Sequence, residues 1–267
     1  MANQYKSTNL PGLFAEERQA QILMLLQERS KLFVSELCDE FSVSPATIRS
    51  DLRELESQGR LKRTHGGAIP VEKATFEPNT VAKTVENIDA KRRIAAYAAT
   101  LIEDGDTIAL DSGTTTLELA QCLKNRTNLT VLTNDIRIAT YLEQNARVTL
   151  VMIGGLLRQG FDCTVGPIAV SSLKALNVDK VFLGANAFSV GRGFSTPDMN
   201  MAEIKRALLR CASERIVLCD SDKFGRISFV EFAGVSDIDR LITDKRVNPK
   251  MVTYLKEHNE DLEFISV

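Results

Sequence analysis

The chain has 267 residues, of which 44% are hydrophobic and 25% are charged, and its formal net charge at pH 7 is −2. These values lie close to globular averages, so they exclude a fibrous or largely disordered chain, and the length favours two domains of unequal size. The longest apolar runs are too short to span a bilayer, and residues 1–12 lack the apolar core of a signal peptide, so we expect a cytoplasmic protein without a membrane partner.

The cysteines and histidines give no sign of a metal centre. The five cysteines include no C-x-x-C pair and their number is odd, which argues against a disulfide framework and against a zinc site. The two histidines, His65 and His258, lie far apart in sequence and outside any ligand spacing. We therefore expect no metal, no cofactor and no pair of nucleophile and base.

The first elements follow the order of a winged helix-turn-helix domain. Residues 16–29 carry leucine and isoleucine at helical spacing, and residues 34–41 predict a shorter helix with Ser35 as its cap. Residues 42–43 then make a tight connection into a third helix. With the basic strand and the glycine turn that come after it, this order predicts a DNA-binding head over residues 14–70.

The third helix has clear local boundaries. Ser44 is a good N-cap, Pro45 suits the first helical position because its missing N–H would be unpaired there, and Gly59 stands where a helix usually stops. The apolar residues of this helix fall on one stripe, which consists of Ile48, Leu52 and Leu55.

The opposite face of that helix is small, polar and cationic. Such a face can approach base edges and phosphates in the major groove of DNA, and the cations after the helix extend the positive charge into the turn at Gly66 and Gly67. The alternative is an ordinary amphipathic surface helix followed by a basic hairpin. The residues expected to contact DNA are Ser44, Ala46, Thr47, Arg49, Ser50, Arg53, Lys62, Arg63, His65 and Gly66.

The rest of the chain predicts an α/β domain. Residues 71–88 have weak periodicity and are expected to form a linker with at most a short ordered piece. Residues 89–267 then alternate apolar strands with helices, which predicts a mostly parallel sheet covered on both faces. The expected helices are 91–103, capped by Asp89, 115–123, 136–144, 201–212 and 249–258, and the expected strands are 107–110, 129–132, 148–153, 180–183, 215–219, 240–243 and 262–266.

One loop of this domain suits an anion. Residues 111–116, Asp-Ser-Gly-Thr-Thr-Thr, follow an apolar strand and open a helix. Gly113 allows a sharp turn, and the free N–H groups and hydroxyls at the helix start would point at one anion such as a phosphate. The alternative is that Ser112 and the threonines only cap the helix.

Similar polar segments follow other predicted strands. They are residues 133–135, 154–155, 184–186 and 220–225, each rich in Gly, Asn or Asp. Each alone could be a turn, but the carboxyl ends of parallel strands gather at one rim of a sheet, where open α/β sheets bind ligands. Together these segments predict a pocket.

The head resembles the DNA-binding module of DeoR-type bacterial transcription regulators. The resemblance rests on Val43-Ser44, Thr47-Ile48-Arg49, Asp51-Leu52, Arg63 and the His-Gly-Gly-Ala run at 65–68. The family usually has two consecutive arginines before Asp-Leu, whereas this chain has Arg49-Ser50. We expect this departure to change the operator sequence and not the fold.

The second half resembles the sensor domain of the same regulators, whose fold is similar to that of ribose-5-phosphate isomerases. By that resemblance the 112–115 loop would cradle the phosphate of a phosphorylated sugar, Lys223 would add a charged contact, and Asp111, Asn134 and Asp220 would recognise sugar hydroxyls. Glu203 and Lys205 lie two apart on a helix, so only one is expected to reach the ligand. The expected effector-binding residues are Asp111, Ser112, Gly113, Thr114, Thr115, Thr133, Asn134, Gly154, Gly155, Gly184, Glu203, Lys205, Asp220 and Lys223.

A second departure follows residues 184–186. The family often has another glycine there, whereas this chain has Ala187-Phe188. We expect the substitution to alter the far wall of the pocket.

The resemblance implies a transcription regulator that binds double-stranded operator DNA, expected to repress a carbohydrate-use operon until a phosphorylated sugar binds. A two-fold symmetric operator requires at least a dimer, and the family implies dimers or tetramers. One alternative is an aldose–ketose isomerase with a carboxylate such as Asp135 as base, but a DNA-binding head serves no purpose in such an enzyme. The other, RNA binding, is disfavoured because side chains cannot read the narrow groove of A-form RNA.

Overall fold

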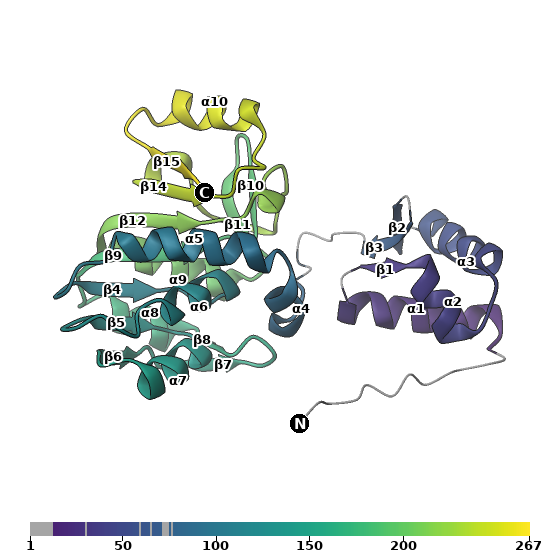
Figure 1. The fold of residues 1–267 in the computed structure, drawn as a ribbon, viewed down its shortest axis with the longest axis horizontal. Coiled ribbons are helices and arrows are strands. Elements are labelled where there is room, and N and C mark those ends of the chain that lie inside the picture. The colour runs from purple at the N-terminus through teal and green to yellow at the C-terminus, as the bar shows by residue number, and fades with distance from the viewer. Residues whose placement is uncertain (1–12, 30, 59, 65, 71–74, 76) are drawn as a thin grey trace. The chain divides into compact units, whose positions relative to one another are not determined.

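The computed structural model describes residues 13–29, 31–58, 60–64, 66–70, 75 and 77–267. The chain divides into two compact units at residues 73 and 74, and each is described here by itself (Figure 1). No helix within these described ranges is long and apolar enough to cross a membrane.

The first unit is a winged helix-turn-helix. Its sheet is antiparallel with strand order β1-β3-β2. This arrangement confirms the predicted order of helices, strand and turn. Its elements are α1 (Ala15–Arg29), β1 (Leu32–Phe33), α2 (Val34–Phe41), α3 (Pro45–Ser57), β2 (Leu61–Thr64) and β3 (Gly67–Pro70).

The start of α3 matches the prediction, whereas the start of α2 does not. The Ser44 hydroxyl accepts a hydrogen bond from the backbone N–H of Thr47 at 3.2 Å, as an N-cap does. Ser35 is not a cap, because α2 already begins at Val34 and the Glu36 carboxylate accepts the N–H of Phe33 at 3.2 Å. Gly59, the expected stop of α3, lies outside the described residues.

The core of the first unit joins α1, α2 and α3 to the sheet. The predicted stripe of Ile48, Leu52 and Leu55 is fully buried in it, as expected. Gly67 is needed where β3 pairs with β1, because a Cβ there would stand 1.8 Å from the carbonyl oxygen of Leu32.

A buried ion pair also ties α1 to α3. The Arg18 guanidinium contacts both carboxylate oxygens of Asp51, at 2.6 and 3.1 Å, and the side chains are 9% and 5% exposed. Gln19 donates to the same carboxylate at 3.4 Å. Asp51 therefore belongs to the interior of the head and not to its DNA-facing surface.

The second unit is built on a seven-stranded parallel sheet of order β15-β14-β12-β9-β4-β5-β6, which confirms the predicted α/β architecture. The sheet strands are β4 (Thr107–Leu110), β5 (Thr130–Thr133), β6 (Thr149–Met152), β9 (Val178–Gly184), β12 (Ala212–Leu218), β14 (Arg240–Thr243) and β15 (Glu263–Ser266). The helices are α4 (Thr80–Val85), α5 (Ile88–Thr100), α6 (Thr114–Gln121), α7 (Ile136–Asn145), α8 (Pro167–Leu173), α9 (Met199–Arg210) and α10 (Pro249–His258).

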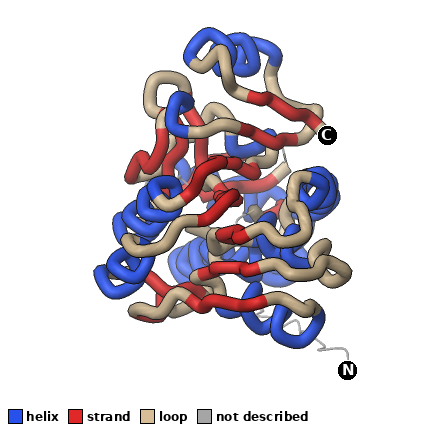
Figure 2. The backbone as a smooth tube through the Cα atoms, turned by 90° about the vertical axis from the view of Figure 1, so that its left-hand side faces the viewer, coloured by secondary structure: helices blue, strands red, loops and turns tan. Residues whose placement is uncertain are grey.

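Helices cover both faces of the sheet, as Figure 2 shows with strands between two rows of helices. One core cluster covers one face of the sheet and contains Ile94 of α5 and Ile138 of α7. The other covers the opposite face and contains Ala169 of α8 and Ile204 of α9. Successive residues of β9 alternate between the two clusters, since Val181 belongs to one and Phe182 to the other. Burial on both faces explains why the strands are continuously apolar.

The structure also contains elements that the sequence pattern did not predict. They include α8, the antiparallel pair β7 (Leu156–Arg158) and β8 (Cys163–Val165), and a small antiparallel sheet of β10 (Ala187–Ser189), β11 (Gly193–Thr196) and β13 (Val230–Ala233). Helix α4 is a short ordered piece inside the segment 71–88, which agrees with the expected linker. Helix α5 begins at Ile88, so Asp89 stands inside its first turn and is not the expected cap.

Candidate functional site

The face of α3 predicted to meet DNA is open to solvent. Ala46, Arg49, Ser50 and Arg53 are exposed, and Thr47 is half-buried. The Arg53 Nε donates to the carbonyl of Arg49 at 3.3 Å, which holds the two cations along the same helix face. This surface is therefore polar and positively charged, as expected.

The hairpin after α3 adds further positive charge. Lys62 and Gly66 are exposed, and Arg63 is anchored to α3 through Glu56, by its Nε at 2.6 Å and its backbone N–H at 2.9 Å. The hydrogen bonds from Arg63 lower the pKa of Glu56. A groove of about 770 Å³ runs between α2, α3 and this hairpin, and Arg49 and Arg63 line it. His65 lies outside the described residues.

One cavity of the second unit lies at the carboxyl ends of β4, β5, β9 and β12. Its volume is about 790 Å³ when the space open to solvent is included. Its described lining includes three carboxylates, Glu77, Asp135 and Asp220, against six cations. Those cations are Lys83, Lys91, Arg137, Arg158, Lys205 and Lys223.

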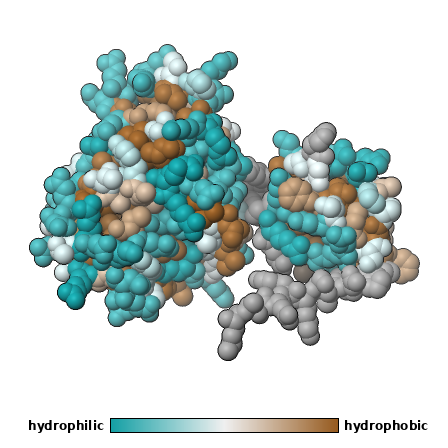
Figure 3. Space-filling view, viewed as in Figure 1, coloured by the Kyte–Doolittle hydropathy of each residue, from teal (hydrophilic) through white to brown (hydrophobic). Residues whose placement is uncertain are grey.

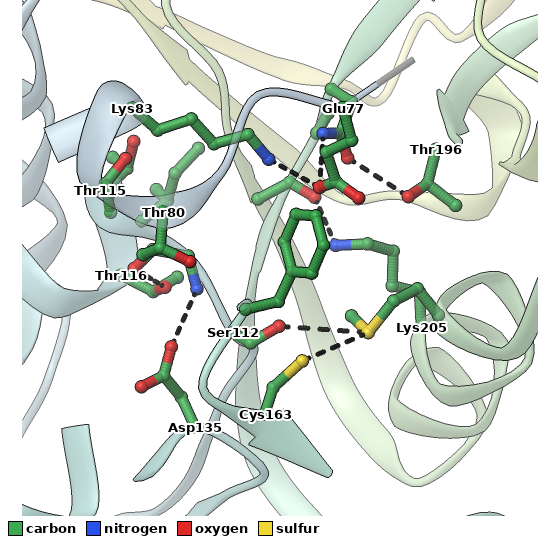
Figure 4. A pocket seen from close by; sticks show the side chains of 18 of the residues that line it. Glu77, Thr80, Lys83, Ser112, Thr115, Thr116, Asp135, Cys163, Thr196 and Lys205 are labelled. Carbon is green, nitrogen blue, oxygen red and sulfur yellow. Dashed lines mark hydrogen bonds and ion pairs between the residues drawn. The ribbon is translucent and has the colours of Figure 1, made fainter. Parts of the chain in front are cut away.

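The start of α6 forms one side of this cavity. The first α-helical backbone bond runs from the N–H of Leu117 to the carbonyl of Gly113 at 3.0 Å, so the N–H groups of Thr114, Thr115 and Thr116 precede it and have no partner within the helix. These residues, Ser112 and Gly113 all line the cavity (Figure 4). Unpaired N–H groups and the positive end of the helix dipole favour an anion at this position.

A buried ion pair stands beside the same loop. Lys205 is 2% exposed and Asp111 is fully buried. The Lys205 ammonium contacts the Asp111 carboxylate and donates to the carbonyl of Gly184 at 2.8 Å, while the N–H of Gly184 donates to Asp111 at 3.0 Å. Asp111 does not line the cavity and its carboxylate holds Lys205, so its contact with a sugar hydroxyl stays a prediction.

Arg137, in the first turn of α7, brings hydrogen-bond donors that have no acceptor. Its Nε and Nη2 are buried without a hydrogen-bond partner, and Nε lies 3.9 Å from Asp135 and 3.7 Å from Asp162. Asp135 instead caps α7 and accepts the N–H of Gly113 at 3.3 Å, and burial raises the pKa of this carboxyl. The donors of Arg137 are suited to an anionic ligand. Arg137 was not predicted as a site residue, although it lies two residues after the predicted segment 133–135.

Another part of the cavity lining is Glu77. Its carboxylate contacts the Lys83 ammonium at 2.5 Å, the Arg158 guanidinium at 2.7 Å and the side-chain amide of Asn186 at 3.0 Å. Burial opposes ionisation of Glu77, but the two cations outweigh it and lower its pKa. Figure 4 shows Lys83 reaching from α4 toward Glu77. Glu77 and Lys83 were not predicted as site residues, because residues 71–88 were expected to form a linker.

A third wall holds Asp220, Lys91 and Lys223. Asp220 accepts the side-chain amide of Asn87 at 2.9 Å, and Lys223 lies 3.7 Å from Glu86. Lys91 is buried and donates to the carbonyl of Lys83, and burial lowers its pKa to about 8. Asp220 and Lys223 therefore lie in the cavity where they were expected, whereas Lys91 was not predicted.

Several of the expected effector-binding residues do not line the cavity. Thr133 and Asn134 are fully buried, and the Asn134 amide donates to the carbonyl of Thr164 at 3.0 Å. Gly154 and Gly155 precede β7, and a Cβ at Gly155 would stand 2.6 Å from the carbonyl oxygen of Val165. These residues shape the backbone around the site and do not reach into it.

The two remaining expectations concern α9 and β10. Glu203 points away from the cavity, with 54% of its side chain exposed and an ion pair to Arg206 at 2.6 Å, so of the two candidates on α9 only Lys205 reaches inward. Ala187 and Phe188 are buried in β10 and do not line the cavity, so their departure from the family pattern does not form its far wall.

A helix-turn-helix unit with a cationic exposed helix, followed by an α/β unit with an anion-suited cavity, defines a DNA-binding regulator with a sensor domain. Family comparison agrees with this class. The DeoR-like helix-turn-helix domain matches residues 18–74, and the DeoR C terminal sensor domain matches residues 86–245. The chain belongs to the DeoR family: it is a DNA-binding transcriptional regulator and not an enzyme.

Individual relatives cover most of the chain. HTH-type transcriptional regulator GlpR of Haloferax volcanii is 38% identical over 85% of this chain and 89% of its own. Transcriptional repressor AccR of Agrobacterium fabrum is 36% identical over 86% of this chain and 89% of its own. Among solved structures, ribose 5-phosphate isomerase A of Methanocaldococcus jannaschii is 21% identical with a TM-score of 0.40, covering 52% of this chain and 55% of that one.

Proposed function

We propose that the second unit binds a phosphorylated sugar, and that this ligand controls binding of the first unit to operator DNA, with the ligand relieving repression of a carbohydrate-use operon. The observation that carries the proposal is the cavity at the start of α6, where unpaired N–H groups meet an excess of cationic side chains. A phosphate monoester has the charge and the several acceptor oxygens that such a site requires.

The phosphate is placed on the loop of Ser112 to Thr115, with Arg137 donating to it from α7. Charge-assisted hydrogen bonds are the strong ones, and the two nitrogens of Arg137 that lack a hydrogen-bond partner, Nε and Nη2, would gain one from a phosphate oxygen. Lys205 and Lys223 add positive charge from α9 and from the turn after β12. The phosphate therefore supplies most of the binding energy in this proposal.

We propose that the sugar contacts polar side chains that line the rest of the cavity, among them Asp220, Asn186 and Thr196. The Asn186 side chain is held between two neighbours, because its oxygen accepts from the Thr196 hydroxyl at 3.1 Å and its amide donates to Glu77 at 3.0 Å. Amide, hydroxyl and carboxylate groups can recognise the hydroxyls of a sugar through hydrogen bonds. The name of one relative, a putative aga operon transcriptional repressor of Escherichia coli O157:H7, supports repression of an operon.

The head is proposed to bind a two-fold symmetric operator through α3, with Arg49 toward the bases and Lys62 toward the phosphates. Symmetric half-sites require at least two copies of the chain, so we propose a dimer or tetramer. For the ligand to change DNA affinity it must bind one arrangement of the protein better than the other, because equal affinity shifts nothing.

Calorimetric titration of the full chain with a panel of sugar phosphates and their unphosphorylated sugars tests the proposal. We expect binding of one or more of the phosphorylated forms, and a loss of about tenfold or more in Arg137→Gln, since a hydrogen bond to a charged group contributes about 1.5–3 kcal/mol. Arg92→Gln is the matched control, because Arg92 pairs with Glu118 and is 63% exposed.

The second half of the test is a gel shift with DNA from the regulator's own promoter, with and without the ligand found. The proposal fails if no sugar phosphate binds, or if the bound ligand leaves DNA affinity unchanged. Equal loss of binding in both arginine variants would show that Arg137 has no special role.

A further inference from the structure

Glu77 is an acidic residue that lines the cavity near α4. Its carboxylate already forms ion pairs with cations that could otherwise bind an anionic ligand. Its side chain is 9% exposed and contacts both Lys83 and Arg158. Lys205 and Lys223 line the same cavity as Glu77, Lys83 and Arg158. The carboxylate therefore lies among the same cations as the proposed phosphate site. Burial lowers the pKa of Lys83, the charges of Lys223 and Lys205 add to this shift, and Glu77 opposes it.

The segment around α4 is attached to the cavity by polar contacts. The Thr80 hydroxyl donates to the carbonyl of Gly160 at 3.3 Å, and Glu86 faces Lys223 at 3.7 Å. On the outer side of α4, Val81 and Val85 are 74% and 76% exposed, so apolar packing does not hold that face. Contacts of this kind depend on charge balance and weaken when one partner is replaced.

We propose that Glu77 is a resident counter-anion which the ligand's phosphate displaces from Lys83 and Arg158, and that this exchange loosens α4. The inference rests on the proposed binding of a phosphorylated ligand and adds the way in which binding is sensed. In the empty cavity Glu77 neutralises the two cations and fixes the segment; with phosphate bound, the cations turn to the ligand and the Glu77 carboxylate loses its partners.

The position of Glu77 in the chain connects its displacement by phosphate to the DNA-binding unit. Pro70 ends β3 of the DNA-binding unit and Glu77 follows it seven residues later, so α4 is the first helix of the second unit. A change in how α4 is held therefore acts on the segment that leads directly from the head. Because the ligand competes with Glu77 for Lys83 and Arg158, it binds the arrangement with Glu77 displaced more tightly than the other, and this difference in affinity supplies the free energy that such coupling needs.

The test compares full-length wild type, Glu77→Gln and Glu214→Gln, with inorganic phosphate as the probe in calorimetry. Glu214 pairs with Arg240 on β12 and β14, apart from the cavity lining, so its variant controls for loss of a partly buried carboxylate. We expect Glu77→Gln to bind phosphate about tenfold or more tightly than wild type, because one competing unit charge is removed from the site. Glu214→Gln should bind as wild type does.

Hydrogen exchange of the α4 amides in the wild type gives a readout that needs no variant. We expect phosphate to speed exchange over residues 80–85, and Glu77→Gln to show the faster exchange without phosphate. Unchanged or weaker phosphate binding in Glu77→Gln, or slower exchange with phosphate, overturns the proposal. If wild type binds phosphate and Arg137→Gln does not, either of these contrary results refutes only the displacement of Glu77. If no phosphate compound binds wild type, the proposed function is refuted as well.

Discussion

Lys205→Met is expected to destabilise the second unit strongly, because it leaves the charge of Asp111 buried without its cation. Lys205 and Asp111 side chains are 3% and 0% exposed, and removing one partner of such a pair costs about 3–5 kcal/mol. The N–H of Gly184 still donates to Asp111 at 3.0 Å, so we expect the lower part of that range. For a unit of this size each kcal/mol shifts Tm by about 2–4 °C, which gives a fall of roughly 6–12 °C.

The assay is thermal unfolding followed by circular dichroism, since the chain has no tryptophan. The double variant Lys205→Met with Asp111→Asn separates stability from binding. It removes both charges, so it should recover most of the lost stability, yet phosphate binding should stay weak because the cation is still absent. A single variant that loses less than about 1 kcal/mol, or a double variant as unstable as the single one, would refute this account of the pair.

Three further outcomes follow from the structure. Asp51→Ala should lower the free energy of unfolding of the head by about 3–5 kcal/mol, because it leaves the Arg18 guanidinium buried without its partner, and urea unfolding unchanged from wild type would contradict this. Arg49→Ala should weaken DNA binding by about 1–3 kcal/mol and relax its sequence preference, whereas Lys62→Ala should weaken binding to all duplexes and lower the salt dependence of the affinity by roughly one unit of slope. Gel shifts at several salt concentrations distinguish the two variants. Equal effects of both variants on specificity would exclude the assignment of Arg49 to the bases and Lys62 to the phosphates. Because the pKa of Lys91 is about 8, this side chain loses its positive charge above that pH. Calorimetry should therefore show the affinity for phosphate falling between about pH 7 and about pH 9. A constant affinity would show that Lys91 does not contribute to binding.

The architecture could be predicted where local pattern and tertiary packing agree. Ser44, Pro45 and the stripe through Leu52 define α3 from sequence alone, and the continuously apolar strands indicate a parallel sheet. The antiparallel additions could not be predicted in the same way, because strands of three or four residues such as β7 and β10 give too few alternations to show a period.

The candidate site likewise contains some residues that could be predicted from the sequence and others that could not. Residues on the sheet rim, such as Gly113 and Asp220, follow from the rule that parallel strands end at one edge. Glu77 and Arg158 come from segments outside the parallel sheet, and neither residue type is unusual in a surface loop, so no spacing marks them. Hydrophilic side chains cover most of the face of the second unit seen in Figure 3, so a hydrophilic side chain alone does not mark a site residue.

Phe188, where the chain departs from the family pattern, acts on the cavity through the turn after β12. Its ring packs against Phe194 at 4.6 Å and Phe224 at 5.5 Å between centroids, and its carbonyl accepts the N–H of Gly225 at 2.8 Å. These contacts hold the turn that carries Lys223 into the cavity. A substitution at Phe188 is therefore expected to shift the position of Lys223 and to change ligand affinity without any direct contact between residue 188 and the ligand, because a packed aromatic cluster transmits a change in volume to its neighbours.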